Sequence, residues 1–233
     1  MAITTVVFDV NETLSDLGPL HEVFRELGAP DGSAPLWFTT TLREGMGLAA
    51  GGEARPFAEI GRSTAAELLR RNGADPGRAD RVIEAFLGLP VHPDVHPGIA
   101  ALRAAGLRLV TLSNGAAAVA ERLLGDHGLR AMFDAVLSVD DGVDSGDSQD
   151  SGDGGNAGVW KPAPHAYTHA LTGLGVAPEE AVMVAVHPWD LHGAARVGMA
   201  TAWLDRDRAT WPGYLTPPTF TVAALPELAA HLD

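Results

Sequence analysis

Polar side chains that can do chemistry follow several apolar runs of the sequence. Asp9 comes directly after TTVVF, Asp190 ends AVMVAVHPWD, and the triplet Ser113–Gly115 ends LRLVTLSNG. Lys161 stands within VWKPAPHAY. The carboxyl ends of parallel strands share one edge of a sheet, where open α/β sheets bind ligands. Two carboxylates, a cation and a hydroxyl–amide pair at such an edge would supply a nucleophile, its counter-charge, an anion clamp and a second acid or base.

Each of these residues also has an ordinary structural role. Asp9, Asp190 or Ser113 would each serve as a cap for the segment that follows its strand. A single lysine such as Lys161 more often keeps its charge in water, and Tyr167 on the next segment suits helix packing. The catalytic interpretation therefore depends on the whole set, which one sheet edge would gather, and not on any single member.

The apolar runs predict the sheet itself. They are Thr4–Val10, Leu107–Ser113, Ala135–Asp140, Ala181–His187 and Thr201–Asp205, with a weaker run at Thr219–Val222. Most are continuously apolar, which is typical of strands covered on both faces. Helical patterns alternate with them at Pro97–Ala105, Ala116–Gly125, His165–Gly173 and Asp190–Val197. The alternation predicts an α/β fold with a doubly wound, mostly parallel, Rossmann-like sheet.

Almost a hundred residues with helical spacing interrupt this alternation after the first strand. The helix-like segments are Leu20–Leu27, Leu36–Ala49, Phe57–Asn72 and Ala79–Leu87. A crossover between parallel strands needs only one helix. We therefore expect a helical cap over residues 16–93 and a core formed by residues 1–15 and 94–233. A cap over the strand ends would shield the site from water.

Residues 143–158 form a low-complexity segment, VDSGDSQDSGDGGNAG. Its aspartates recur every third residue, which does not match the ligand pattern of an EF-hand calcium loop. We expect a flexible, solvated surface loop within the core.

Composition excludes several classes of function. The 233-residue chain contains no cysteine, which rules out disulfides, thiolate catalysis and zinc–thiolate sites. A formal net charge of −14 repels phosphate backbones, so no nucleic-acid partner is expected. No apolar run reaches the roughly 20 residues that a membrane span needs, and the start lacks a secretory signal pattern. We therefore expect a cytoplasmic protein whose partner is a small anionic substrate.

Four motifs, in order, resemble those of the haloacid dehalogenase superfamily. They are FDVNETLSD at residues 8–16, TLSNG at 111–115, KPAPHAY at 161–167 and VHPWD at 186–190. The stretch at residues 92–115 is similar to the one that leads to the second motif in type II 2-haloacid dehalogenases. The resemblance covers the core over nearly the whole chain and, more loosely, the cap. Dimers are common in that family, so a homodimer is compatible with the resemblance.

The resemblance implies a role for each motif residue. The Asp9 carboxylate would displace halide from carbon and form an ester, which water would hydrolyse with Asp190 as base. Lys161 would hold the carboxylates, and Thr13 would donate a hydrogen bond to Asp9. The residues that we expect to contact the substrate are Asn11, Trp37, Phe38, Arg43, Ser113, Asn114, Tyr167 and His187. Among them, Ser113 and Asn114 would bind its carboxylate.

Asn11 favours a dehalogenase over a phosphatase. Phosphatases of the superfamily carry a second aspartate at this position, which protonates the leaving alkoxide. Asparagine cannot do so, but a halide leaves without a proton. Phosphatases also need magnesium to bring two anions together, and the fourth motif offers only Asp190 for it. We therefore expect no required cofactor or metal, with Mg²⁺ belonging only to the phosphatase alternative.

The chain also departs from the type II pattern. Where those enzymes have an aromatic residue after the nucleophile, this chain has Asn11, and where they have an arginine after Leu-Trp, it has Phe38. Arg43 is a candidate replacement for that arginine. A serine and an asparagine that help to position water are replaced by Ala185 and His187. A structural role for His187 is as well founded as a catalytic one. Three hypotheses follow: a 2-haloacid dehalogenase, a phosphatase or other hydrolase on the same scaffold, and a non-catalytic protein that binds a small anion or a partner.

Overall fold

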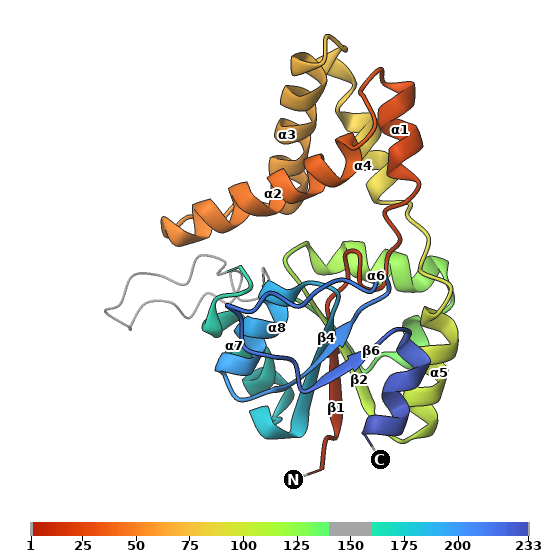
Figure 1. The fold of residues 1–233 in the computed structure, drawn as a ribbon, viewed down its shortest axis with the longest axis vertical. Helices are drawn as coiled ribbons and strands as arrows, with labels where there is room; N and C mark the ends of the chain where they lie inside the picture. The colour runs from red at the N-terminus through yellow and green to blue at the C-terminus, as the bar shows by residue number, and fades with distance from the viewer. Residues whose placement is uncertain (1, 140–159, 233) are drawn as a thin grey trace.

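A parallel sheet forms the centre of the core (Figure 1). The computed structural model describes residues 2–139 and 160–232, and within them the sheet has six strands in the order β3-β2-β1-β4-β5-β6. Every neighbouring pair is parallel. The strands are β1 (Thr5–Phe8), β2 (Arg108–Ser113), β3 (Ala135–Ser138), β4 (Ala181–Ala185), β5 (Ala200–Leu204) and β6 (Phe220–Val222). The predicted α/β class and parallel sheet are confirmed.

Helices cover both faces of this sheet, which explains its continuously apolar strands. Val6 and Phe8 of β1 pack into one apolar cluster, and Val7 between them packs into the cluster on the opposite face. The first face is covered by α5 (Val95–Ala104), α6 (Ala117–Asp126) and the 3₁₀ helix η5 (Leu225–His231). The second is covered by α7 (Pro164–Leu174) and α8 (Pro188–Arg196). Two short 3₁₀ turns, η2 (Arg130–Met132) and η4 (Pro178–Glu180), precede β3 and β4.

A helical insert follows β1 and lies beyond the carboxyl ends of the strands (Figure 1). It contains α1 (Leu20–Glu26), α2 (Ser33–Ala50), α3 (Phe57–Arg71), the 3₁₀ turn η1 (Pro76–Arg78) and α4 (Asp80–Phe86). The insert has its own aromatic core, in which Phe57 stacks on Phe86 and Trp37 donates a hydrogen bond of 2.8 Å to the Gly61 carbonyl. Its exact boundaries with the core, predicted as residues 16–93, stay a prediction.

Trp160 links the insert to the core. This residue immediately precedes Lys161 in the core, yet its ring belongs to the apolar cluster of the insert and stacks on Phe57. A Cβ atom at Gly45 of α2 would lie 2.2 Å from that ring. Glycine at position 45 therefore allows α2 to approach the segment that carries Lys161.

An ion pair fixes the turn that follows β1. The Arg206 guanidinium contacts both carboxylate oxygens of Asp94, at 2.9–3.2 Å, and also donates to the carbonyls of Glu12 and Thr13. Asp94 in turn accepts the backbone N–H of Leu225. This network ties the turn after β1 to α5 and η5, and so positions the residues next to Asp9.

The structure contains the helices and strands predicted from the sequence, and their observed bounds differ from the predicted ones by a few residues. The predicted loop at residues 143–158 lies outside the described residues. In the described part of the chain, no helix is both long and apolar enough to cross a membrane.

Candidate active site

The strand order reverses between β1 and β4, and the candidate site lies at that point. Asp9 follows β1 directly, and Asp190 lies in the first turn of α8, just after β4. β2 and β3 continue the sheet on one side of β1, whereas β4, β5 and β6 continue it on the other. Loops after such neighbouring strands diverge to opposite faces and leave a crevice at the carboxyl edge. The topology therefore brings Asp9 and Asp190 together.

Lys161 bridges the two carboxylates. Its Nζ atom donates to Asp9 Oδ1 at 2.9 Å, to Asp190 Oδ2 at 2.6 Å and to the Leu112 carbonyl at 2.8 Å. These bonds use all three donors of the ammonium group. The side chain is 0% exposed, and Lys161 is the only lysine in the chain, whose other fifteen basic residues are arginines. A compact ammonium group fits this buried three-way contact, whereas a planar guanidinium does not.

The electrostatics of the bridge shift the pKa values of Asp9 and Asp190 in opposite directions. Burial alone would raise the pKa of Asp9, but the charges of Lys161 and His187, with hydrogen bonds from Lys161 and Thr13, hold it below its usual value. For Asp190, burial and the neighbouring Asp9 carboxylate raise the pKa despite Lys161. Burial opposes the charge of Lys161 as well, but the two carboxylates raise its pKa. Asp9 is thus an ionised carboxylate in a largely dry setting, as a carboxylate nucleophile requires.

Thr13 fixes the second oxygen of Asp9. Its hydroxyl donates to Asp9 Oδ2 at 2.8 Å and accepts the backbone N–H of Val186 at 3.2 Å. The hydroxyl therefore ties the loop after β1 to the loop after β4 and sets the orientation of the carboxylate. The sequence placed Thr13 beside Asp9, and the structure has this contact.

Two residues expected to contact the substrate contact the partners of the bridge. The Tyr167 hydroxyl contacts Asp190 Oδ1 at 2.6 Å and the Asp190 carbonyl at 2.9 Å, and burial beside Asp190 raises the pKa of Tyr167 well above its usual value. The Asn114 amide donates to the Lys161 carbonyl and accepts the Lys161 N–H. Each side chain thus holds one partner of the bridge in place. A contact of Tyr167 or Asn114 with the substrate stays a prediction.

Asn11 and Ser113 line a small cavity between core and insert. The cavity has a volume of about 60 Å³, and Phe57 and Phe86 close it from the insert. Ser113 Oγ accepts the N–H of Gly115 at 2.9 Å, so its own hydroxyl hydrogen can be donated to a ligand. The amino-terminal end of α6 borders the same cavity, and backbone N–H groups at a helix start attract anions.

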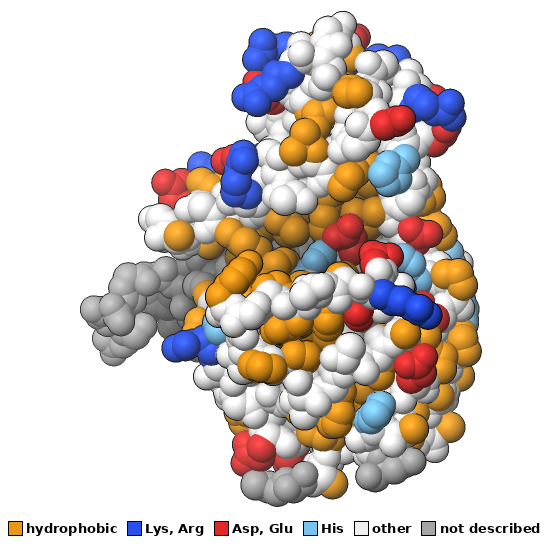
Figure 2. All heavy atoms as spheres, in the orientation of Figure 1, with side chains coloured by type: hydrophobic (Ala, Val, Ile, Leu, Met, Phe, Trp, Pro, Cys, Tyr) orange, Lys and Arg blue, Asp and Glu red, His pale blue; other side chains and the backbone are white. Residues whose placement is uncertain are grey.

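His187 lies beside Asp9 and Glu12, with its Nε2 atom 3.8 Å from Asp9 Oδ2 and 3.5 Å from Glu12 Oε2. The His187 ring stacks on Phe38 of the insert and on Trp189 of α8, with centroid distances of 6.1 and 5.2 Å. Phe38 thus reaches the site, at the position where the type II pattern has arginine. Both His187 and Glu12 line a cavity of about 610 Å³, and Figure 2 shows acidic and histidine side chains gathered where insert and core meet.

Sequence reasoning missed Glu12. Its backbone adopts a left-handed conformation with φ of 63°, which is costly for a residue with a side chain. Burial, together with the carboxylates of Asp9 and Asp207, raises the pKa of Glu12 against the opposing charge of His187. The signal available in the sequence was a charged residue within the tight turn between Asn11 and Thr13.

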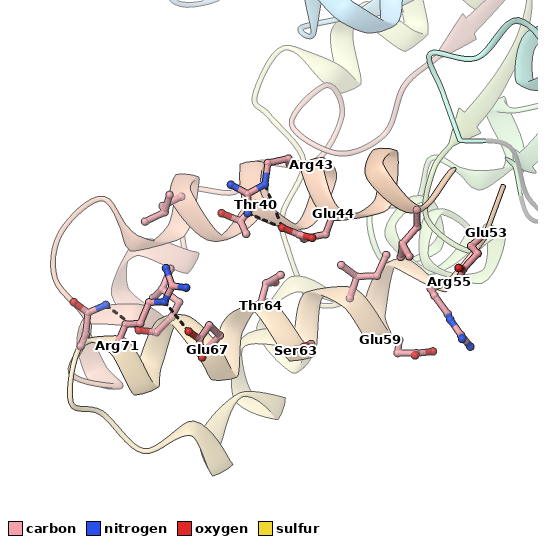
Figure 3. Close-up of a pocket in the computed structure, with 15 residues that line it drawn as sticks. Thr40, Arg43, Glu44, Glu53, Arg55, Glu59, Ser63, Thr64, Glu67 and Arg71 are labelled. Carbon is pink, nitrogen blue, oxygen red and sulfur yellow. Dashed lines mark hydrogen bonds and ion pairs between the residues drawn. The ribbon is translucent and has the colours of Figure 1, made fainter. Parts of the chain in front are cut away.

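The structure places Arg43 and Trp37 away from Asp9, which corrects two expectations. The side chain of Arg43 is 71% exposed and binds Glu44, in a cavity between α2 and α3 (Figure 3). The reason is helical phase, because Arg43 shares a face of α2 with Leu36 and Thr40, whereas Trp37 points into the core of the insert. Arg43 therefore does not replace the missing arginine, and Trp37 is a core residue.

A close backbone contact behind the bridge gives a stability prediction. A Cβ at Gly193 of α8 would lie 2.7 Å from the Pro162 carbonyl and 2.6 Å from the Tyr167 hydroxyl. We expect Gly193→Ala to lower the free energy of unfolding by about 1–3 kcal/mol, because overpacking displaces the segment that carries Lys161. Chemical denaturation measures this. The control is Gly173→Ala on α7, which meets nothing within 4 Å and should gain up to about 1 kcal/mol. Equal stability of the two variants would contradict the prediction.

Comparison with known proteins identifies the family. A model of haloacid dehalogenase-like hydrolases matches residues 3–198. The (S)-2-haloacid dehalogenase of Pseudomonas putida is 26% identical over 237 residues, covering 99% of this chain and 96% of that protein. Haloacetate dehalogenase H-2 of Moraxella sp. (strain B) is 30% identical over 158 residues, covering 68% of this chain and 63% of that protein. The chain thus spans less than two thirds of the length of the Moraxella relative.

Another relative has a different activity. The phosphoserine phosphatase of Thermus thermophilus is 34% identical over 145 residues, which cover 60% of this chain and 52% of that protein. Solved structures resemble this one over their whole length. An L-2-haloacid dehalogenase from Xanthobacter autotrophicus, with chloropropionic acid covalently bound, has a TM-score of 0.83 at 27% identity, covering 98% of this chain and 97% of that one. With its parallel sheet, its helical insert and a family match over most of its length, this chain belongs to the haloacid dehalogenase-like hydrolases.

Proposed function

We propose that this hydrolase removes halide from a short 2-haloalkanoic acid through an ester on Asp9. The observation that carries the proposal is the state of the Asp9 carboxylate. It is buried, its pKa is held down, and its two oxygens are oriented by Lys161 and Thr13. The relatives named as 2-haloacid dehalogenases, and the one solved with chloropropionic acid covalently bound, support the same chemistry.

In the first step, an oxygen of Asp9 attacks the carbon that bears the halogen. The carbon–halogen bond breaks, the halide leaves with the bonding electrons, and an Asp9 ester remains. No proton is transferred, so Asn11 in place of an acid is no obstacle. The Ser113 hydroxyl and the start of α6 are the proposed binding groups for the substrate carboxylate. The cavity of about 60 Å³ beside them supports a short carbon chain.

In the second step, water attacks the carbonyl carbon of the Asp9 ester. Asp190 is the proposed base, because it shares Lys161 with Asp9 and its raised pKa suits it to accept a proton. Lys161 stabilises the negative charge that develops on Asp9 Oδ1. The product is the 2-hydroxy acid. No cofactor enters this scheme, and a homodimer in the cytoplasm stays a prediction.

A magnesium-dependent phosphatase is the alternative, and the phosphoserine phosphatase relative is the observation in its favour. The donor groups at the site do not fit it. Lys161 already contacts one oxygen of Asp9 and one of Asp190, so the cation beside both carboxylates is an ammonium group. Asn11 cannot protonate a leaving alkoxide in place of an aspartate. Both features favour the carbon–halogen bond.

Halide release distinguishes the two functions. We expect the protein to release chloride from 2-chloropropionate without added metal, and to leave nitrophenyl phosphate intact in the presence of magnesium. A halide electrode and absorbance at the nitrophenol band measure the two reactions. The Asp9→Ala variant controls for spontaneous hydrolysis. Magnesium-dependent nitrophenol release without halide release would overturn the proposed function in favour of the phosphatase.

A further inference from the structure

One nitrogen of His187 faces the reacting carboxylate. The Nε2 atom lies 3.8 Å from Asp9 Oδ2, 3.5 Å from Glu12 Oε2 and 3.3 Å from the Asn11 carbonyl. Three oxygen acceptors around one ring nitrogen favour the form in which that nitrogen carries a hydrogen. In that form the Nε2–H group donates to the Asn11 carbonyl at 3.3 Å, and Asp9 Oδ2 lies 3.8 Å from the same nitrogen.

The two oxygens of Asp9 have different neighbours. Oδ1 contacts the fully buried Lys161, whereas Oδ2 accepts from Thr13 and lies 3.8 Å from His187 Nε2. Attack on the substrate through Oδ2 leaves Oδ1 as the ester carbonyl, still bound to the Lys161 ammonium. Hydrolysis of that ester then breaks the bond between Asp9 Cγ and Oδ2, and Oδ2 leaves with the product as an alkoxide.

An alkoxide is a poor leaving group unless it receives a proton, whereas the halide of the first step needs none. Asp190 is fully buried, and its two carboxylate oxygens contact Lys161 and Tyr167. Asn11 has no acidic proton. Among the described residues, His187 is the proton donor whose nitrogen faces Oδ2.

We propose that His187 is the general acid of the second step and protonates the departing Oδ2 through Nε2, an inference that rests on the proposed function. The present separation of 3.8 Å is longer than a hydrogen bond. Catalytic hydrogen bonds are often long without substrate and shorten in the complex. The His187 side chain is 13% exposed and held between two aromatic rings, so its orientation is fixed.

The step balances in atoms and charge. Water adds its oxygen to Asp9 Cγ and gives one proton to Asp190. The Cγ–Oδ2 bond then breaks, its electron pair goes to Oδ2, and the imidazolium form of His187 gives Oδ2 the Nε2 proton to form the hydroxyl of the product, leaving a neutral imidazole. Asp9 is left as a carboxylic acid. Asp9 and Asp190 each then release a proton, of which one restores His187 and one goes to solvent.

Glu12 is a second carboxylate beside His187. Its carboxylate is 3.5 Å from His187 Nε2 and lines the larger cavity. The other charged and titratable groups that line this cavity are Asp16, His21, His92, Asp205, Arg206 and Asp207. Arg206 is paired with Asp94, so acidic groups dominate around Glu12. This arrangement suits proton exchange with solvent.

The test measures the formation and the hydrolysis of the Asp9 ester separately in the His187→Gln variant. With 2-chloropropionate, we expect a burst of one chloride per site within a few-fold of the wild-type rate. Steady-state release should then be about 10²–10⁴-fold slower, the usual contribution of a general acid. Mass spectrometry should find the ester accumulated on the Asp9 peptide. His165→Gln, an exposed histidine on α7, is the matched control and should behave as wild type.

A second substrate separates proton donation from a purely structural role. The product of 2-chloro-3,3,3-trifluoropropionate is a more acidic alcohol, whose alkoxide leaves more easily without a proton. The effect of His187→Gln should be at least tenfold smaller with it than with 2-chloropropionate. Equal losses for both substrates, loss of the chloride burst, or wild-type turnover would each overturn the role of His187. If wild-type protein forms no Asp9 ester at all, the proposed function fails, and the inference fails with it.

Discussion

Replacement of Asp9 by asparagine is expected to lower halide release from 2-chloropropionate by at least about 10⁴-fold. The effect is of the size seen when a catalytic nucleophile is removed, because the neutral amide cannot displace halide. The shape of the side chain is kept, and its oxygen can still accept from Lys161 Nζ, which now lies 2.9 Å from Asp9 Oδ1. We therefore expect a folded protein. Halide release and thermal unfolding measure the two properties.

Asp31→Asn is the matched control for that experiment. Asp31 is exposed, in the turn before α2, so the same chemical change there should leave activity unaltered. Activity retained in Asp9→Asn would remove Asp9 as the nucleophile. If a biological activity survived in that variant without hydrolysis, the chain would be a non-catalytic binder of a small anion or a partner.

Replacement of Lys161 by methionine is the second large effect. Methionine fills a similar volume but leaves two buried carboxylates without their shared cation. Removing one partner of a buried ion pair costs about 3–5 kcal/mol, and we expect the free energy of unfolding to fall by that order. Loss of the charge that stabilises Asp9 Oδ1 should lower turnover by about 10²–10³-fold or more.

The pH dependence of Lys161→Met follows from the pKa of Asp9. Lys161 helps to hold that pKa below its usual value, so the variant should have a higher one. The nucleophile must be ionised, and its ionised fraction rises with pH. Residual turnover in Lys161→Met should therefore increase with pH over a range where wild-type turnover no longer depends on Asp9 ionisation. A parallel pH profile in the two proteins would contradict the role of the bridge.

Lys161→Arg is the control for charge alone. It keeps a cation but not the compact donor that contacts Asp9, Asp190 and the Leu112 carbonyl together. We expect little recovery of activity because a guanidinium is too large for this fully buried position. Full recovery would mean that the charge suffices and the three-way geometry does not matter.

Much of this site could be predicted from the sequence, because the fold brings it together. Continuously apolar runs indicated parallel strands, and parallel strands end at one edge. That rule alone predicts that Asp9, Ser113 and Asp190 lie near one another. The position of Lys161 is predicted from the motif before α7. The contacts among Asp9, Lys161, Asp190 and Thr13 depend only on backbone topology and the usual reach of side chains.

What the sequence could not predict is the direction of side chains within those elements. Tyr167 and Asn114 were expected to contact the substrate, and the structure shows each bonded to a partner of the bridge. Arg43 was expected near the site from its type alone, and one turn of α2 was enough to place it on the exposed face. Such choices depend on packing between distant segments, as between Trp160 and Gly45.

Glu12 and His187 illustrate a different limit. Motif comparison marked His187 as a substitution with a catalytic or a structural role, and it left Glu12 unnoticed. The distances in the structure show how the two residues are related, because the carboxylates of Asp9 and Glu12 face the same nitrogen of His187. Phe38, which also departs from the type II pattern, stacks on His187 from the insert.

Oxygen labelling in a single turnover tests the central claim, that Asp9 itself bonds to the substrate carbon. Protein in excess over 2-chloropropionate reacts in water enriched in ¹⁸O, and mass spectrometry analyses both the lactate and the Asp9 peptide. The covalent route predicts unlabelled hydroxyl oxygen in the lactate, because that oxygen comes from Asp9, and one ¹⁸O gained by the Asp9 carboxylate. Lactate that carries ¹⁸O in its hydroxyl, with Asp9 unlabelled, would show direct attack by water and contradict the account.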